Sequence, residues 1–452
     1  MAKKDKILFY CTECGNSQNK WSGKCFACNA WNTLVEDRVS KKSTRNSTRF
    51  SSKEPIPLGQ NVRDKNMRHK TGIEEFDRVT GGGFVKGSVT LIGGEPGIGK
   101  STIIMQILQH LEGEKFLYFS GEESEAQIQI RAQRLKIKDS RILLSCDNNL
   151  ESILHQIEKN KPDFVIIDSI QTLYSDDYDN VPGSITQVKE CAGQLQRKAK
   201  EEDISLILIG HITKSGNIAG PKILEHLVDT VLYLESGQHN HYRTLRSMKN
   251  RFGSTNEVGI FEMHDTGLWP VDNPSGFFLS EKRDHISGST ISASMEGTRP
   301  ILIEIQALVT KTIYGNPQRT SNGIDYKKLA MLIAILEKRG GYPLGTQDVF
   351  LNIVGGLKID DTSINLAVLV AIISSFRDIA INSKSVFIGE VGLGGEVRSV
   401  PFIETKVKEA LKFGYERIYI PKYNKKNLNN NNNKIIGIDS IGQLFAIIFN
   451  KE

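Results

Sequence analysis

The 452-residue chain lacks a long hydrophobic run, has few cysteines and is close to balanced in charge. Its most apolar stretch, residues 366–373, is far shorter than the ~18 residues that a membrane-spanning helix requires, so we expect a core helix there. The lysine-containing N-terminus has no apolar segment long enough for a secretory signal. Four of the six cysteines stand close together, which favours metal binding over disulfide bonds. These absences argue against a membrane protein and predict a cytoplasmic one.

The composition is that of a globular protein with a sizeable core, because 39% of the residues are hydrophobic and 24% are charged. The length predicts about two to four domains. The net charge is only +6, but positive residues are concentrated between residues 38 and 70. Such a run is either a solvated linker or a contact for nucleic acid, and both interpretations stay open. We expect a basic linker over residues 36–58.

The most specific motif follows the apolar run at residues 89–92. The string GEPGIGKST fits the phosphate-binding pattern G-x-x-x-x-G-K-[ST] between an expected strand and an expected helix. Backbone N–H groups of such a loop surround a triphosphate, while Lys100 would reach the β and γ phosphates and Ser101 would coordinate Mg²⁺. The alternative is a chance glycine-rich turn. The predicted ATP-binding residues are Gly94, Glu95, Pro96, Gly97, Ile98, Gly99, Lys100, Ser101 and Thr102.

Two Cys-x-x-Cys pairs predict a zinc module over residues 1–35. Four thiolates form a tetrahedral shell that suits Zn²⁺, and the metal would supply the folding energy of so small a segment. The predicted ligands are Cys11, Cys14, Cys25 and Cys28. We expect the neighbouring aromatic residues Trp21, Phe26 and Trp31 to pack over the metal site, with stacking on bases as the alternative. The remaining cysteines, Cys146 and Cys191, are expected to be buried apolar residues.

Alternating apolar runs and helical stretches predict a mostly parallel sheet covered by helices over residues 59–270. The expected strands are 89–92, 116–119, 141–145, 164–167, 204–209 and 230–234. Asp168 ends one of these strands, where a carboxylate lies beside the phosphate loop and can hold Mg²⁺ through water. A core strand that happens to end in an acid is the alternative.

Hydrolysis of a triphosphate needs a carboxylate that orients and deprotonates water. Glu122 and Glu123 follow an expected strand and are the candidates, although acids also stabilise helix N-termini without any catalytic role. In the next loop, His211, Thr213 or Lys214 would sense the γ-phosphate, unless they are ordinary polar loop residues.

Several strings together resemble the RadA (also called Sms) family of bacterial DNA-repair proteins, essentially from end to end. They are TGIEEFDRVTGGGFVKG at residues 71–87, the phosphate loop, FSGEES at 119–124 and KNRFG at 249–253, together with the zinc module. The resemblance implies a RecA-like ATPase that assembles as a homohexameric ring, similar to DnaB-type helicases. It further implies movement along single-stranded DNA, branch migration of recombination intermediates, and a possible partnership with the RecA recombinase.

The KNRFG string would act between subunits. Lys249 and Arg251 would reach the nucleotide of a neighbouring subunit and neutralise charge there, while Phe252 and Gly253 would shape the turn. The alternative is two exposed cations on a loop. The resemblance also places DNA-binding loops at residues 175–186 and 214–222, which are rich in small polar residues.

The C-terminal part, residues 271–452, is expected to hold a strand at 300–309 and helices at 326–338 and 365–376. Its segment 389–400 resembles the end of the Lon protease domain. Alignment with that domain places Ser363 at the serine position and Glu404, not a lysine, at the base position of the Ser–Lys dyad, with Lys406 and Lys408 out of register. We therefore expect an inert scaffold for ring assembly. The asparagine tract at 427–433 is expected to be a loop.

The expected fold class is thus α/β, with a RecA-like P-loop ATPase core, an N-terminal four-cysteine zinc module and a C-terminal Lon-protease-like domain. The leading hypothesis for function is a DNA-stimulated, ATP-driven motor. Two alternatives remain: an ATP-dependent protease, suggested by the Lon-like segment, and a ring ATPase that switches protein interactions, similar to the KaiC branch of RecA-like proteins.

Overall fold

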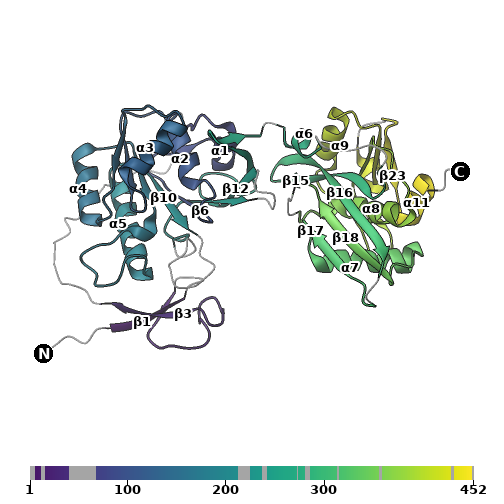
Figure 1. Cartoon of the computed structure of the whole chain (residues 1–452), viewed down its shortest axis with the longest axis horizontal. Helices are drawn as coiled ribbons and strands as arrows, with labels where there is room; N and C mark the ends of the chain where they lie inside the picture. The colour runs from purple at the N-terminus through teal and green to yellow at the C-terminus, as the bar shows by residue number, and fades with distance from the viewer. Residues whose placement is uncertain are drawn as a thin grey trace, which may run out of the picture. The chain divides into compact units, whose positions relative to one another are not determined.

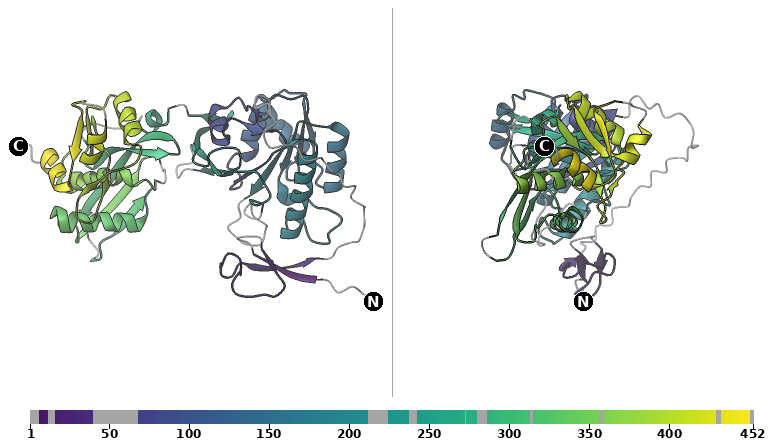
Figure 2. Two further views of the ribbon diagram at one scale, coloured as in Figure 1. Left: turned by 180° about the vertical axis from the view of Figure 1, so that it is seen from behind. Right: turned by 90° about the vertical axis from the view of Figure 1, so that its right-hand side faces the viewer.

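The computed structural model describes residues 6–11, 16–39, 68–211, 224–236, 242–271, 273–279, 286–312, 315–355, 359–428 and 432–449. The chain divides into two compact units, the first ending at Pro270 and the second continuing from Val271. Figures 1 and 2 show the elements of each unit. Within the described residues, no helix is long and apolar enough to cross a membrane.

The N-terminal part of the first unit is a small antiparallel sheet with the strand order β2-β1-β3. Its strands are β1 (Lys6–Cys11), β2 (Ser17–Gln18) and β3 (Leu34–Val39). A separate strand pair, β4 (Arg68–His69) and β5 (Phe84–Val85), flanks helix α1 (Glu74–Thr80).

The rest of the first unit is built on one large sheet with the order β14-β13-β12-β11-β6-β10-β9-β7-β8. The strands from β11 to β8 in this order are parallel, and β12, β13 and β14 extend the sheet antiparallel. The strands are β6 (Val89–Gly94), β7 (Phe116–Ser120), β8 (Ile142–Ser145), β9 (Phe164–Asp168), β10 (Ser205–His211), β11 (Thr230–Ser236), β12 (Tyr242–Asn250), β13 (Val258–His264) and β14 (Gly267–Pro270). The expected strands are confirmed; the antiparallel extension was not among them.

Helices cover both faces of this sheet, which explains why its central strands are apolar on both sides. The helices are α2 (Lys100–Leu108), α3 (Glu125–Arg134), α4 (Leu150–Asn160) and α5 (Ile185–Glu201), with a short 3₁₀ turn at Ile170–Thr172. One core holds α4 and α5 against alternate residues of β6, β7, β9 and β10. The other core holds α1, α2 and α3 against the opposite face, an arrangement that can be followed in Figure 1.

The helix starts differ in a way that matters for function. The side chains of Ser124, Asn149 and Ser184 cap α3, α4 and α5 by accepting hydrogen bonds from main-chain N–H groups. Helix α2 follows Gly99 and has no side-chain cap. Its first N–H groups therefore remain available to an anion.

The second unit is an α/β domain whose sheet has the order β17-β18-β16-β15-β19-β22-β23. Its strands are β15 (Ser289–Glu296), β16 (Arg299–Lys311), β17 (Arg319–Asn322), β18 (Gln347–Ile353), β19 (Ser385–Phe387), β22 (Arg417–Pro421) and β23 (Ile435–Ile438), with a separate pair β20 (Glu390–Val391) and β21 (Val397–Arg398). Its helices are α6 (Pro274–Leu279), α7 (Tyr326–Ile335), α8 (Asn365–Arg377), α9 (Ile403–Lys412), α10 (Lys422–Asn427) and α11 (Ile441–Phe449). A π-helical turn, Leu336–Gly340, continues α7, and a 3₁₀ turn, Thr362–Ile364, precedes α8. Residues 366–373 of α8 are fully buried, as expected for a core helix.

Candidate nucleotide site and metal centre

The phosphate loop joins β6 to α2 and depends on glycine for its shape. Gly97 and Gly99 have φ values of 75° and 111°, which favour glycine. A Cβ atom added at Gly94 would stand 2.6 Å from the carbonyl oxygen of Leu234 on β11. The loop therefore has the backbone geometry that the sequence motif predicts, next to an uncapped helix start.

Lys100 is the first residue of α2 and turns back over the loop. Its Nζ donates hydrogen bonds to the carbonyl oxygens of Gly94 and Glu95, both at 2.9 Å, and lies 3.1 Å from His211 Nδ1. Burial lowers the pKa of Lys100 to about 8, against the opposing influence of Asp168 and Glu122. The ammonium group thus contacts main-chain oxygens in a place that a phosphate oxygen could take.

Asp168 ends β9 inside the site and is only 8% exposed. Burial raises its pKa, while hydrogen bonds from Ser101 and Tyr118 oppose the shift. The Tyr118 hydroxyl, from the neighbouring strand β7, donates to Asp168 Oδ2. A hydroxyl and a carboxylate that already contact one another offer the oxygen ligands that Mg²⁺ prefers, so Ser101 and Asp168 fit the magnesium site.

The two candidate acids differ in their partners. Glu122 Oε1 accepts a hydrogen bond from Ser169 Oγ at 2.5 Å and lies 3.0 Å from His211 Nε2. The hydrogen bond from His211, followed by that from Ser169, lowers the pKa of Glu122 to about 2. Glu123 instead forms an ion pair with Arg131 of α3 at 2.5 Å. Of the two, Glu122 is the carboxylate near Lys100, and Glu123 is occupied by an arginine.

These groups surround a cavity of about 530 Å³. The lining comprises loop and helix residues Pro96, Gly97, Gly99, Lys100, Ser101 and Thr102, the acids Glu122, Glu123 and Asp168, and also Ser120, Arg131, Arg134, His211, Arg243, Met263, His264, Asp265 and Gly267. Sequence reasoning missed Tyr118 and Arg243. Arg243, 8% exposed, donates from Nε to the carbonyl oxygen of Ile98 at 3.0 Å. Arg243 lies in β12, a strand that was not expected from the sequence, and no sequence motif marks it.

Lys249 and Asn250 are the last two residues of β12. The turn that follows consists of Arg251, Phe252 and Gly253. Lys249 Nζ donates to the carbonyl oxygens of Glu225 and Val228, at 2.6 and 2.8 Å. Arg251 Nη1 contacts Asp229 Oδ1 at 3.0 Å, and its side chain is 52% exposed.

This turn lies at the opposite end of the sheet from the phosphate loop. Asp229, the partner of Arg251, also accepts a hydrogen bond from the backbone N–H of Val89, the first residue of β6. Gly94 is the last residue of the same strand. At about 3.3 Å per residue, the strand separates the two by roughly 16 Å, so Arg251 does not contact the phosphate loop of its own chain.

In the N-terminal sheet, the Sγ atoms of Cys11, Cys25 and Cys28 lie within 4.8 Å of one another. Cys14 lies outside the described residues. Three converging thiols fit a thiolate-rich zinc site. The expected packing of aromatic residues over the metal is wrong, because the side chains of Trp21, Phe26 and Trp31 are 63%, 76% and 70% exposed. Among the other cysteines, Cys191 is buried as expected, but Cys146 is exposed.

The C-terminal domain corrects the alignment with Lon. Glu404 lies on the exposed side of α9, paired with Lys408 at 2.8 Å. Lys406 is fully buried, and its Nζ donates to Asp361 Oδ2 at 2.8 Å. Since α9 turns about 100° per residue, a shift of two positions moves the side chain from solvent to the core. Lys406, not Glu404, therefore contacts the segment that contains Ser363.

Ser363 itself is fully buried. Its Oγ donates to the carbonyl oxygen of Ala293 at 3.0 Å, and its N–H donates to Asp361 Oδ1 at 2.9 Å. Burial lowers the pKa of Lys406, and the ion pair with Asp361 opposes this shift. Ser363, Asp361 and Lys406 thus form a hydrogen-bonded group that is largely closed to solvent.

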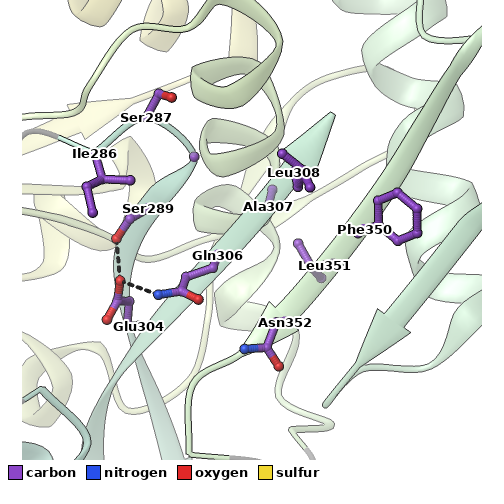
Figure 3. A pocket seen from close by; sticks show the side chains of 11 residues that line it. Ile286, Ser287, Ser289, Glu304, Gln306, Ala307, Leu308, Phe350, Leu351 and Asn352 are labelled. Atoms are coloured by element: carbon purple, nitrogen blue, oxygen red, sulfur yellow. Dashed lines mark hydrogen bonds between the residues drawn. The ribbon is translucent and has the colours of Figure 1, made fainter. Parts of the chain in front are cut away.

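A second hollow of about 490 Å³ lies on this domain's sheet, beside β15, β16 and β18 (Figure 3). Its buried acid, Glu304, accepts hydrogen bonds from Ser289 Oγ at 2.6 Å and Gln306 Nε2 at 3.0 Å. None of the residues selected from the sequence lines it.

Of the expected DNA-binding loops, the segment 175–184 precedes α5 and is held by Gln187, whose side chain bonds to backbone groups of Ser175, Tyr178 and Asn180. The segment 214–222 lies outside the described residues, as do Thr213 and most of the basic stretch 38–70. His211, the third sensor candidate, contacts both Lys100 and Glu122.

An uncapped helix behind a glycine loop, with a strand-end acid beside it, defines a P-loop ATPase, and the fold of the sheet around it is RecA-like. Here that core is joined to a zinc ribbon and a Lon-like α/β domain. From the N-terminus to the C-terminus, three family models match the chain: the rubredoxin metal-binding domain at residues 9–36, the KaiC ATPase at 69–144 and the ChlI subunit of Mg-chelatase at 320–424. The ATPase binds ATP with Mg²⁺, and the ribbon binds Zn²⁺.

Curated relatives resemble the chain over almost its whole length. The DNA repair protein RadA of Listeria monocytogenes is 47% identical over 98% of both chains, and that of Bacillus subtilis is 49% identical over 93% of both. Among solved structures, a KaiC-like protein of Pyrococcus horikoshii matches 45% of this chain and 98% of its own, with 21% identity and a TM-score of 0.38. The chain belongs to the RadA family of DNA repair proteins.

Proposed function

We propose that the protein is a DNA-stimulated ATPase that moves along single-stranded DNA and drives branch migration of recombination intermediates. It would do so as a DnaB-like ring of six copies, acting together with the RecA recombinase. The main support for this proposal is the position of the KNRFG turn, which lies at the end of the strands opposite its own phosphate loop.

Two cations that do not contact their own nucleotide site are suited to a neighbour's. The half-exposed side chain of Arg251 can leave the buried Asp229 for a phosphate, because Asp229 keeps two other partners, Lys200 Nζ at 3.4 Å and the N–H of Val89. Lys249 is held by two carbonyl oxygens, which do not neutralise its charge. A neighbouring subunit packed against this end of the sheet would place its bound phosphates within reach of Lys249 and Arg251. Each nucleotide site would then be formed by residues of two chains.

Within one site, the residues divide the chemistry of hydrolysis. Lys100 and the uncapped N–H groups of α2 would bind the phosphates, and Ser101 and Asp168 would hold Mg²⁺, which would supply neutralisation of developing negative charge. Glu122 is our candidate for the group that orients and deprotonates water, because Ser169 and His211 fix its position and it lies near Lys100. His211 contacts both Glu122 and Lys100 and would sense the state of the γ-phosphate.

We propose that the Lon-like domain is proteolytically inert and serves ring assembly. A Ser–Lys dyad requires a neutral amine beside an accessible hydroxyl. Here the amine of Lys406 is paired with Asp361, and the hydroxyl of Ser363 is buried and bound to a backbone carbonyl. Peptide release from an unfolded protein in the presence of ATP is therefore expected to be absent; release that disappears in Ser363→Ala would overturn this assignment.

The motor itself is tested by ATPase assays with and without a single-stranded oligonucleotide at low salt. We expect the rate to rise with DNA and to vanish in Lys100→Ala. The contribution between subunits is tested by mixing Lys100→Ala protein with Arg251→Ala protein. Each is expected to be inactive alone, whereas mixed rings contain interfaces that combine an intact site with an intact arginine and regain part of the activity. An ATPase indifferent to DNA, or mixtures that stay inactive, would contradict the proposal.

A further inference from the structure

We propose that the zinc ribbon carries a stacking surface for single-stranded DNA, formed by Trp21, Phe26 and Trp31. The inference rests on the proposed action on DNA and adds a second contact, outside the ATPase core. Its starting point is the exposure of all three rings, each more than 60% accessible, in a segment where packing over the metal would have buried them.

The Trp31 ring is held in place by the ribbon. Trp31 pairs with Lys24 in a β-bridge, and the N–H of the next residue, Asn32, donates to the carbonyl oxygen of Gly23 at 2.9 Å. A Cβ atom added at Gly23 would stand 3.5 Å from the ring, at ordinary van der Waals distance, so the indole lies along the backbone of Gly23. A ring fixed in this way loses little conformational entropy when it binds a partner.

The charges around the rings suit a phosphate backbone. The sequence from residue 16 to residue 35 contains Lys20 and Lys24 and no aspartate or glutamate. The Nζ of Lys24 lies 5.8 Å from the centroid of the Trp31 ring. Single-stranded nucleic acids bind where aromatic rings stack on bases and nearby cations follow the phosphates.

The same features fit a protein partner less well. Among the described residues 16–35, the exposed large hydrophobic side chains are Trp21, Phe26 and Trp31, together with Val35, which at 37% is the least exposed of the four. Lysine is depleted in protein–protein interfaces, whereas here Lys20 precedes Trp21 and Lys24 lies beside the Trp31 ring. Flat rings between lysines therefore favour bases over an apolar protein surface.

Tryptophan fluorescence tests the proposal directly, because the chain contains only three tryptophans and two of them are in the ribbon. In full-length zinc-loaded Trp269→Phe protein, we expect an oligothymidylate to quench the emission of Trp21 and Trp31. The matched control, Trp21→Phe with Trp31→Phe, retains Trp269 and should show little quenching. An abasic oligonucleotide of equal length carries the same phosphates without bases and should also quench little. Equal quenching by the abasic strand, or none by either strand, would overturn the inference.

A second measurement separates stacking from general apolar contact. For Trp31→Leu, we expect the concentration of single-stranded DNA that half-saturates ATPase stimulation to rise about tenfold, as for the loss of one stacked base. Trp31→Tyr should stay near the unmodified protein, and both variants should keep their zinc content, their KM for ATP and their maximal rate. A leucine variant that binds DNA as well as the tyrosine variant would assign the surface to a protein partner instead. If single-stranded DNA stimulated the ATPase but did not quench the emission of Trp21 and Trp31, only this inference would be contradicted. If the DNA did not stimulate the ATPase at all, the proposed function would be contradicted.

Discussion

Lys100 in the ATPase domain and Lys406 in the C-terminal domain are both buried lysines near carboxylates, but they have different surroundings. Lys100 lines a cavity of about 530 Å³ and donates to the carbonyl oxygens of its own loop. Lys406 lines neither of the two cavities described above and donates to Asp361, whose carboxylate also accepts the N–H groups of Met295 and Ser363.

The comparison shows that access and partner exchange, not residue type, decide which lysine can take part in chemistry. The carbonyl oxygens that hold Lys100 are neutral, so a phosphate is the better partner and can replace them. Asp361 is a fixed anion that already satisfies the charge of Lys406. A lysine in a cavity that is open to a charged ligand can bind that ligand. A lysine whose charge is already neutralised by a neighbouring carboxylate contributes to the stability of the fold instead.

The strongest test of the open site is Glu122→Gln. The amide keeps the size of the side chain but cannot accept a proton, so we expect the rate of ATP hydrolysis to fall by about 10²- to 10⁴-fold. ATP binding, measured by calorimetry, should persist. Glu123→Gln is the matched control and should keep most of the activity, because Glu123 is paired with Arg131. If the two variants lost activity equally, the geometry would not distinguish the catalytic acid.

The strongest test of the sealed site is Lys406→Ala. Removal of the ammonium leaves Asp361 without its ion-pair partner, and breaking such a pair costs about 3–5 kcal/mol. We expect a markedly lower unfolding temperature for the C-terminal domain in calorimetry of the full chain. The double change Lys406→Met with Asp361→Asn removes both charges and should recover much of the loss. A Lys406→Ala protein as stable as the original would show that the pair is not structural.

The sequence could predict the open site because its geometry follows from local motifs. Gly94 to Ser101 form one continuous string, and Asp168 ends an apolar parallel strand whose carboxyl end lies on the same side of the sheet as the phosphate loop. It could not predict which acid lies near Lys100 and which pairs with an arginine, because Glu122 and Glu123 are adjacent in sequence and only their contacts with His211 and Arg131 distinguish them.

Features that depend on distant segments escaped prediction. Arg243 reaches Ile98 across 145 residues of sequence, and Tyr118 reaches Asp168 across 50. The alignment that favoured Glu404 failed for a related reason: the helical periodicity of α9 buries Lys406, but a comparison of strings carries no information on which side of the helix faces the core.

The pH dependence of nucleotide binding sharpens the contrast between the two lysines. Burial lowers the pKa of Lys100 to about 8 in the free protein, and bound phosphates favour the ammonium and would raise it. Below pH ~8 the lysine is protonated in both states and affinity should be constant. Above it, binding must take up a proton, so affinity should fall by up to about tenfold per pH unit. Calorimetry in buffers of different ionisation enthalpy measures this uptake. Lys100→Arg, which stays charged, should show a flat profile; a parallel decline in that variant would assign the effect to another group.

The smallest expected effect compares the supports of the two acids. Asp168 receives a hydrogen bond from the neutral hydroxyl of Tyr118, whereas Asp361 receives one from a cation. Tyr118→Phe removes a single neutral donor, which contributes about 1 kcal/mol, so we expect the Mg²⁺ concentration for half-maximal ATPase activity to rise about fivefold. The reason is that Asp168 loses the bond that orients it and opposes the rise of its pKa. The KM for ATP at saturating Mg²⁺ should not change, which separates a loss of metal support from a general disturbance of the site. An unchanged Mg²⁺ requirement would mean that Ser101 and the strand alone hold the carboxylate in place.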